Sequence, residues 1–107
     1  MKITTEKRED GMLVTVAGRL DALGAPEFDA AMDKLLAAGE RNFIVNLGGV
    51  LSLSSAGLRS ILLLGRKVAE HHGKLLLHQV GGSVKEVFDI SGFSAWRLES
   101  GHWVKET

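Results

Sequence analysis

Hydrophobic residues recur along the chain at two spacings, one typical of strands and one typical of helices. Residues 3–8 and 12–17 are rich in β-type residues and are separated by Glu9-Asp10-Gly11. Asp-Gly between two such segments is a hairpin signal, which predicts a pair of antiparallel strands. Pro26 stands where a helix can begin, and apolar residues follow at helical spacing up to Gly39: Phe28, Ala31, Met32, Leu35 and Leu36.

The middle of the chain predicts two buried strands joined through a loop and a long helix. Residues 42–47 and 74–79 are strand-length segments of mainly apolar residues, which favours strands covered on both faces. A loop is expected over residues 48–55. A helix is expected from residue 56 to about 72, with Gly73 ending it.

The last quarter of the chain carries weaker signals. Val84, Val87 and Phe88 predict a short helix that stops at Ser91-Gly92, and residues 97–104 are expected to be strand-like or irregular. The order of elements, β-β-α-β-α-β-α, predicts an α/β fold with a partly parallel sheet that carries helices. In open sheets of this kind, function usually lies in loops at the carboxyl ends of strands, and the loop over 48–55 is one of these.

Composition excludes several classes of function. The 107 residues are enough for one domain with its own core, so residues 1–107 are expected to form a single domain. With no cysteine, the chain has no disulfide, thiolate zinc site or cysteine nucleophile. The 13 basic and 13 acidic residues balance, which argues against a nucleic-acid binder. The N-terminus lacks an apolar signal segment, and the apolar run 61–64 is far shorter than the ~20 residues that span a membrane, so we expect a cytoplasmic protein without membrane insertion.

The motifs of several enzyme classes are also absent from the sequence. It contains no phosphate-binding loop, dinucleotide fingerprint or nucleophile elbow. None of the histidines lies three or four residues from another, as a helical metal pair requires; they are His71, His72, His78 and His102. We therefore expect no metal, no cofactor and no enzymatic activity.

Two serines mark the start of the long helix. One hydroxyl, of Ser54 or Ser55, suffices to cap the helix by accepting a hydrogen bond from an amide of the first turn. The second hydroxyl then lies beside free amides and the positive end of the helix dipole, which is a favourable place for a phosphate.

The helical wheel of residues 56–72 predicts an apolar face and a basic face. The residues expected to face the sheet are Leu58, Ile61, Leu62, Gly65, Val68 and Ala69, with Leu64 on their flank. Leu63 falls on the opposite face with Arg59, Ser60, Arg66 and Lys67. No acidic residue occurs from Arg41 through Ala69, so this face is expected to be basic and to serve as a docking surface.

The run Ser54-Ser55-Ala56-Gly57-Leu58-Arg59, preceded by Asn46-Leu47 and Val50, resembles the signature of STAS domains. Within that family it is similar to bacterial anti-sigma factor antagonists, whose usual run is Asp-Ser-Ser/Thr-Gly-Leu. Gly18-Arg-Leu-Asp21 resembles a second family element, and Val84 to Gly92 resembles a third, a helix that ends in Ser-Gly. The resemblance covers nearly the whole chain in the right order.

The resemblance implies a mixed sheet of four to five strands with helices packed mainly on one side, and a role in partner switching. In that scheme the unphosphorylated antagonist binds an anti-sigma factor that is also a serine kinase. Phosphorylation of the motif serine dissociates the complex, and a metal-dependent serine phosphatase resets the cycle. The family's phosphorylated serine lies two residues before the glycine, which is Ser55 here, with Ser54 as the alternative.

Two positions depart from the family's usual run. Ser54 stands where the family has an acid, and Ala56 where it has serine or threonine, which leaves fewer candidate acceptors of a phosphate.

Asp21 has two open interpretations, a turn residue before the first helix or a part of the partner surface. The expected partner-binding residues are Asp21, Ser54, Ser55, Ala56, Leu58, Arg59, Leu63 and Arg66.

Two other functions stay open at this point. A STAS subunit that regulates the ATPase of an ABC-type lipid transporter would dock through the same helix without phosphorylation. A nucleotide-binding domain is compatible with the glycine-containing loop and the basic helix.

Overall fold

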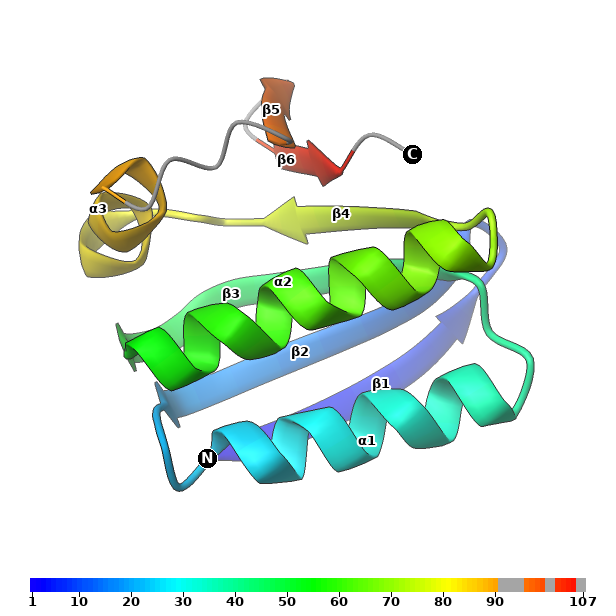
Figure 1. The fold of residues 1–107 in the computed structure, drawn as a ribbon, viewed down its shortest axis with the longest axis horizontal. Coiled ribbons are helices and arrows are strands. Elements are labelled where there is room, and N and C mark those ends of the chain that lie inside the picture. Colours follow the sequence, from blue (N-terminus) through cyan, green and yellow to red (C-terminus); the bar gives the residue numbers. More distant parts are fainter. Residues whose placement is uncertain (91–95, 100–101, 106–107) are drawn as a thin grey trace.

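A six-stranded mixed sheet, in the order β1-β2-β3-β4-β6-β5, forms the framework of the computed structural model. The structure describes residues 1–90, 96–99 and 102–105. Along the chain the elements are β1 (Lys2–Arg8), β2 (Gly11–Leu20), α1 (Ala25–Ala37), β3 (Asn42–Leu53), α2 (Ser55–Glu70), β4 (Lys74–His78), α3 (Gly82–Ile90), β5 (Trp96–Glu99) and β6 (His102–Lys105) (Figure 1). The expected alternation of strands and helices is confirmed, and the segment over 97–104 provides two short strands.

The predicted hairpin is present, and Gly11 explains its geometry. β1 and β2 pair antiparallel, with Arg8 opposite Gly11. Gly11 has φ +140°, and an added Cβ would lie 2.6 Å from the carbonyl oxygen of Asn42. Only glycine fits both the backbone conformation and this close approach.

One face of the sheet carries α1 and α2, which lie side by side (Figure 1). Val14, Val45 and Leu77 are neighbours across β2, β3 and β4, and each is fully buried. They belong to one core with apolar residues of the two helices, such as Phe28 and Ile61. The inner strands were expected to be covered on both faces, and this is only partly confirmed. On the face away from the helices, Ile44 is buried, but its neighbour Leu76 is half-buried.

The expected loop over 48–55 is wrong, because β3 continues through it to Leu53. β2 also continues to Leu20, and the two strands keep pairing in parallel past two register shifts. Gly49 lies opposite Ala17, and a Cβ on Gly49 would lie 3.1 Å from the Cβ of Ala17, so the glycine lets the strands approach. The connection between β3 and α2 shrinks to Ser54 alone.

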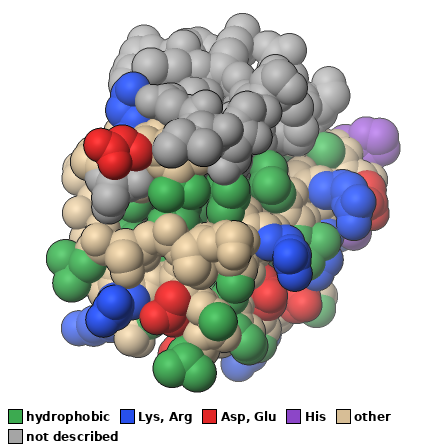
Figure 2. Space-filling view, turned by 60° about the vertical axis from the view of Figure 1, so that its left-hand side comes forward, with side chains coloured by type: hydrophobic (Ala, Val, Ile, Leu, Met, Phe, Trp, Pro, Cys, Tyr) green, Lys and Arg blue, Asp and Glu red, His purple; other side chains and the backbone are tan. Residues whose placement is uncertain are grey.

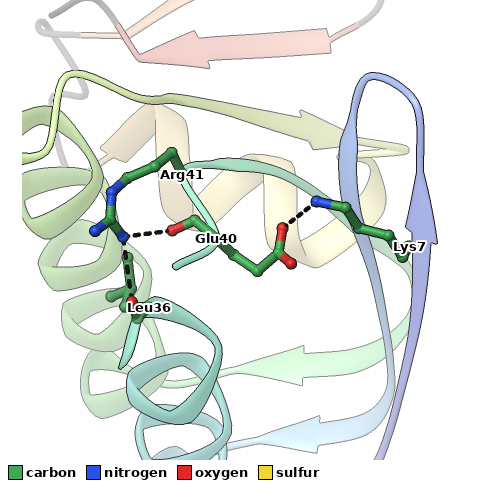
Figure 3. Close-up of polar contacts among 4 residues, drawn as sticks. All are labelled: Lys7, Leu36, Glu40 and Arg41. Carbon is green, nitrogen blue, oxygen red and sulfur yellow. Dashed lines mark hydrogen bonds and ion pairs between the residues drawn. The ribbon is translucent and has the colours of Figure 1, made fainter. Parts of the chain in front are cut away.

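The other end of the molecule, where β1 turns into β2, is tied to the α1–β3 turn (Figure 3). Lys7 Nζ donates to Glu40 Oε1 at 2.6 Å. The guanidinium of Arg41 donates to the carbonyl oxygens of Leu36 at 3.1 Å and Glu40 at 2.9 Å. The carbonyl of Leu36 also accepts from the amide of Gly39 at 3.0 Å, so Arg41 adds a second hydrogen bond at the end of α1.

The C-terminal predictions are partly outside the described residues. α3 begins at Gly82 and includes Val84, which is buried in the core, but the expected stop at Ser91-Gly92 lies outside the described part of the chain. In the part of the chain that the structure describes, no helix is both long and apolar enough to cross a membrane.

Candidate functional site

The two serines of the motif lie where β3 ends and α2 begins, and Ser54 is the cap. Ser54 is extended, with φ −91° and ψ 174°, and its side-chain oxygen accepts a hydrogen bond from the amide of Gly57 at 3.3 Å. Its carbonyl oxygen accepts from the amide of Leu58 at 2.9 Å, and its own amide donates to Leu20 O at 3.1 Å. The Ser54 hydroxyl is therefore engaged in starting the helix.

Ser55 is the first residue of α2, and its side chain is exposed. Its hydroxyl makes no hydrogen bond with any residue that the structure describes. The first turn of α2 contains no acidic residue, so no carboxylate of that turn offsets the positive end of the helix dipole. The arrangement presents a free hydroxyl to solvent at a position that tolerates added negative charge.

Gly57 allows the start of α2 to lie directly on the end of β2. An added Cβ would overlap the carbonyl oxygen of Leu20 and would lie 2.9 Å from both Leu20 Cγ and Leu53 Cδ1. Because glycine has no side chain, α2 approaches the two strand ends closely. This contact sets Ser55 beside the loop that leaves β2.

Asp21 organises that loop between β2 and α1. Its Oδ1 accepts hydrogen bonds from the amides of Gly24 at 3.0 Å and Leu23 at 3.1 Å. The hydrogen bond from Gly24, followed by the bond from Leu23 and the charge of Arg19, lowers the pKa of the Asp21 carboxyl despite an opposing effect of burial. This geometry matches the turn interpretation of Asp21.

A family model described as "Mlab, STAS domain" matches residues 3–99 of the chain. The chain belongs to the STAS domain family. A relative from Bordetella bronchiseptica with the provisional name anti-sigma factor antagonist BtrV is 33% identical over 93 residues, which cover 87% of this chain and 80% of the relative.

Solved structures of STAS-type proteins have the same fold. The phosphorylated form of the Bacillus cell fate determinant SpoIIAA matches with a TM-score of 0.71 at 19% identity, covering 87% of this chain and 86% of that one. An anti-sigma factor antagonist from Mycobacterium paratuberculosis matches with a TM-score of 0.77 at 20% identity, covering 87% and 79%. The expected mixed sheet with helices mainly on one side is thus confirmed, but it has six strands instead of the expected four to five, because the C-terminal segment adds β5 and β6.

The exposed face of α2 in this STAS domain differs from the predicted one. Leu62 was expected to face the sheet, but it is 43% exposed, whereas Leu64, expected on the flank, is 3% exposed. Leu63 is half-buried and faces α1 with Ser60, which is 4% exposed. We call the exposed side chains at positions i, i+4, i+7 and i+11 of α2 the outer stripe: Ser55, Arg59, Leu62 and Arg66.

The helical wheel predicted the wrong rotation of α2 because the sequence alone does not show that a neighbouring helix covers one side of α2. The sheet takes the side that bears Ile61, Leu64 and Val68, and α1 takes the next side. The four consecutive apolar residues from Ile61 leave the phase of the wheel undecided, so only the position of α1 reveals which leucine is exposed.

The expected basic face is partly neutralised by α1. Lys67 Nζ lies 2.6 Å from Asp33 Oδ1, and Asp29 lies farther back along α1 in the same seam. Within the described ranges, neither Arg59 nor Arg66 forms an ion pair. The basic side chains of α2 without an ion-pair partner among the described residues, Arg59 and Arg66, therefore both lie on the outer stripe.

Most of the predicted partner-binding residues lie around the start of α2, but Leu63 and Arg66 lie about two and three turns farther along it, and the set differs in exposure. Ser55, Arg59 and Arg66 are exposed, and Leu58 is buried and packs in the core. The half-buried members are Asp21, Ser54, Ala56 and Leu63. Sequence reasoning missed Leu23 and Leu51, which are 91% and 77% exposed; a leucine inside a Gly-bounded turn is the signal that could have found Leu23.

Figure 2 shows the end of the molecule at which α2 begins, where hydrophobic side chains lie between basic and acidic ones. An open hollow of about 410 Å³ also lies there, between the end of β3 and the start of α3. Gln79 is the one polar side chain among the described residues that line it, so the hollow offers no cation for a phosphate. In the described segments no group of three or more His, Asp or Glu side chains is placed to hold a metal ion.

Proposed function

We propose that this STAS domain is an anti-sigma factor antagonist that works by phosphorylation-controlled partner switching. The observation that carries the proposal is the division of labour between the two serines. Ser54 is engaged as the helix cap, while the Ser55 hydroxyl is exposed and unpaired at the start of α2. The relative from Bordetella, whose provisional name is that of an antagonist, supports the same function.

In the unphosphorylated state the outer stripe binds an anti-sigma factor that is also a serine kinase. The stripe has an apolar centre, Leu62, flanked by the cations of Arg59 and Arg66. Apolar centres with a charged rim are typical of protein interfaces. Binding sequesters the anti-sigma factor and releases the sigma factor. Because transcription takes place in the cytoplasm, the chain acts there. The chain acts by docking and not by catalysis.

Phosphorylation then ends the complex. The Ser55 oxygen takes the γ-phosphoryl group of ATP, ADP leaves, and the hydroxyl proton passes to a base of the kinase. The phosphate brings about −1.5 to −2 charges at pH 7. Arg59 lies one helical turn away and pairs with it, which removes a cation from the docking surface. A metal-dependent serine phosphatase restores the free hydroxyl.

Phosphosite mapping tests this function. The full chain and its Ser55→Ala variant are incubated with ATP and the kinase that co-purifies with the chain from native cells, and the products are analysed by tandem mass spectrometry. We expect phosphate on Ser55 of the wild type and none on Ser55→Ala. Modification confined to Ser52 or Ser60 would contradict the proposal, and Ser60 is only 4% exposed.

A second candidate is a docking subunit of a transport ATPase that needs no phosphorylation. It is favoured by Ser54, which stands where the family usually has an acid that a kinase can read. The same co-purification separates the two, because a transporter ATPase is then recovered and the chain stays unmodified in the presence of ATP.

A further inference from the structure

A groove opens between the first halves of α1 and α2, next to Ser55. Its volume is about 200 Å³, and its walls are small or apolar side chains: Ala22, Ala25, Pro26, Ala56 and Leu63. Farther along both helices the seam narrows to about 10 Å³, next to the ion pair of Lys67 with Asp33. Since Ala56 follows Ser55 directly, the groove borders the proposed phosphorylation site.

A buried hydroxyl without a partner lines this groove. Ser60 contributes to both the groove and the narrow seam, and only 4% of the residue is exposed. Its hydroxyl forms no hydrogen bond with any residue in the described part of the chain. A buried polar group without a partner costs free energy, and most such groups in folded proteins are paired. Ser60 therefore offers a hydrogen bond that a bound group would complete.

The two charged groups that line the groove favour a neutral occupant. Asp29 and Arg59 both line the groove, and neither forms an ion pair with another described residue. A cationic group meets the charge of Arg59, and an anionic group meets the charge of Asp29. The carboxylate accepts and the guanidinium donates, so an uncharged hydroxyl, which does both, fits the pair.

The volume of the groove fits an aromatic ring. A cavity of about 150 Å³ accommodates benzene, so about 200 Å³ takes a ring with one polar atom. Tyrosine combines a rigid apolar ring with a hydroxyl and is enriched at the energetic centres of interfaces. We infer that the docking partner anchors a tyrosine side chain in this groove, with the ring against the alanines and the hydroxyl among the polar lining groups of Ser60, Asp29 and Arg59. This inference rests on the proposed docking function.

Titration of the full chain with p-cresol, the side-chain analogue of tyrosine, tests the groove without the partner. Amide chemical shifts are followed by NMR, and toluene, which lacks the hydroxyl, is the matched probe. We expect p-cresol to shift the amides of Ala22, Ala56 and Ser60 and to bind about 3- to 10-fold more tightly than toluene, because of the added hydrogen bonds. Shifts that lie elsewhere, or equal binding of the two probes, would overturn the inference.

Variants of the groove sharpen the test. Ala22→Leu fills the groove from an exposed position and is expected to abolish binding of both probes, whereas the control Ala30→Leu, at an exposed position of α1 outside the groove, leaves them unchanged. Ser60→Ala is expected to weaken p-cresol to the level of toluene, with an unchanged or raised melting temperature because no hydrogen bond is lost. A p-cresol affinity that survives both Ala22→Leu and Ser60→Ala contradicts the inference.

Calorimetry with the co-purified kinase tests whether the partner occupies the groove. We expect Ala22→Leu to weaken the complex at least 10-fold and Ala30→Leu to leave it unchanged. Equal affinities of Ala22→Leu and wild type would overturn the tyrosine anchor even where p-cresol binds. If the kinase binds no form of the chain, wild type included, the proposed function is wrong, and the p-cresol titration still decides whether the groove takes a phenol.

Discussion

Ser54 and Ser55 are chemically identical neighbours in different surroundings. The hydroxyl of Ser54 is half-buried and bonded to the amide of Gly57, whereas that of Ser55 is exposed and unbonded. The sequence predicted that one of the two caps the helix. It could not decide which one, because the choice depends on where β3 stops pairing with β2, and this is a long-range property of the sheet.

Replacing Ser54 tests its role as the cap. Ser54→Ala is expected to lower the free energy of unfolding by about 1 kcal/mol, because the amide of Gly57 loses its acceptor. Ser54→Asp keeps an acceptor and adds a favourable charge at the helix start, so its stability should equal or exceed that of the wild type. Urea unfolding measures both, and an Ala variant as stable as the wild type would contradict the capping role.

Asp21 gives the molecule a pH-dependent contribution to stability. Hydrogen bonds from Gly24 and Leu23 lower the pKa of its carboxyl in the folded state below the ordinary value of 3.8. The contribution is therefore complete above pH 3.8 and is lost as the pH falls through the lower pKa of the folded state.

Asp21→Asn keeps a side-chain acceptor but removes the charge. We expect it to be less stable than the wild type at pH 7 and equally stable in strong acid, as measured by urea unfolding at a series of pH values. A constant difference at all pH values would contradict this account. If the kinase binds both forms equally, the turn is the only role of Asp21.

At the scale of elements, most strands and helices could be predicted because their apolar patterns are long and regular. Two features could not. The glycine pair before Val50 indicated a loop, although long-range pairing with β2 keeps this segment in β3. The apolar run from Ile61 left the rotation of α2 undecided until α1 was seen to cover Ser60 and Leu63.

The rotation of α2 leads to a test with neighbouring leucines. Leu62→Glu, on the outer stripe, should keep the melting temperature and weaken kinase binding at least 10-fold, because it adds an acid to the docking surface. Leu63→Glu should lower the melting temperature, because it carries a charge into the seam beside Asp29 and Asp33. Thermal unfolding and calorimetry distinguish the two, and the reverse pattern would restore the rotation predicted from the sequence.

At the scale of the whole molecule, the two ends of the sheet differ in role. One end is tied by the contacts of Lys7, Glu40 and Arg41 shown in Figure 3. The other end gathers the exit of β2, the end of β3 and the start of α2, because parallel strands end together. The sequence predicted a functional segment at the carboxyl end of a strand, but it did not predict the groove, which depends on how closely α1 and α2 pack.

With this arrangement, a phosphate on Ser55 is expected to change the docking surface and to leave the fold unchanged. At the first position of α2 an added negative charge meets free amides and the favourable end of the helix dipole. The phosphate instead makes the free energy of binding to the partner less favourable. In the complex its charge must lose its water or face the acidic surface of a partner that binds a basic stripe. A loss of about 2–5 kcal/mol, or about 30- to 5,000-fold in affinity, is the expected scale.

The most direct measurement is a calorimetric titration of the kinase with wild type, Ser55→Ala and Ser55→Asp, accompanied by their melting temperatures. The account predicts similar melting temperatures for all three, wild-type affinity for Ser55→Ala, and affinity at least about 30-fold weaker for Ser55→Asp. A Ser55→Asp variant that stays folded and binds the kinase as tightly as the wild type would contradict the central claim that charge at Ser55 controls docking.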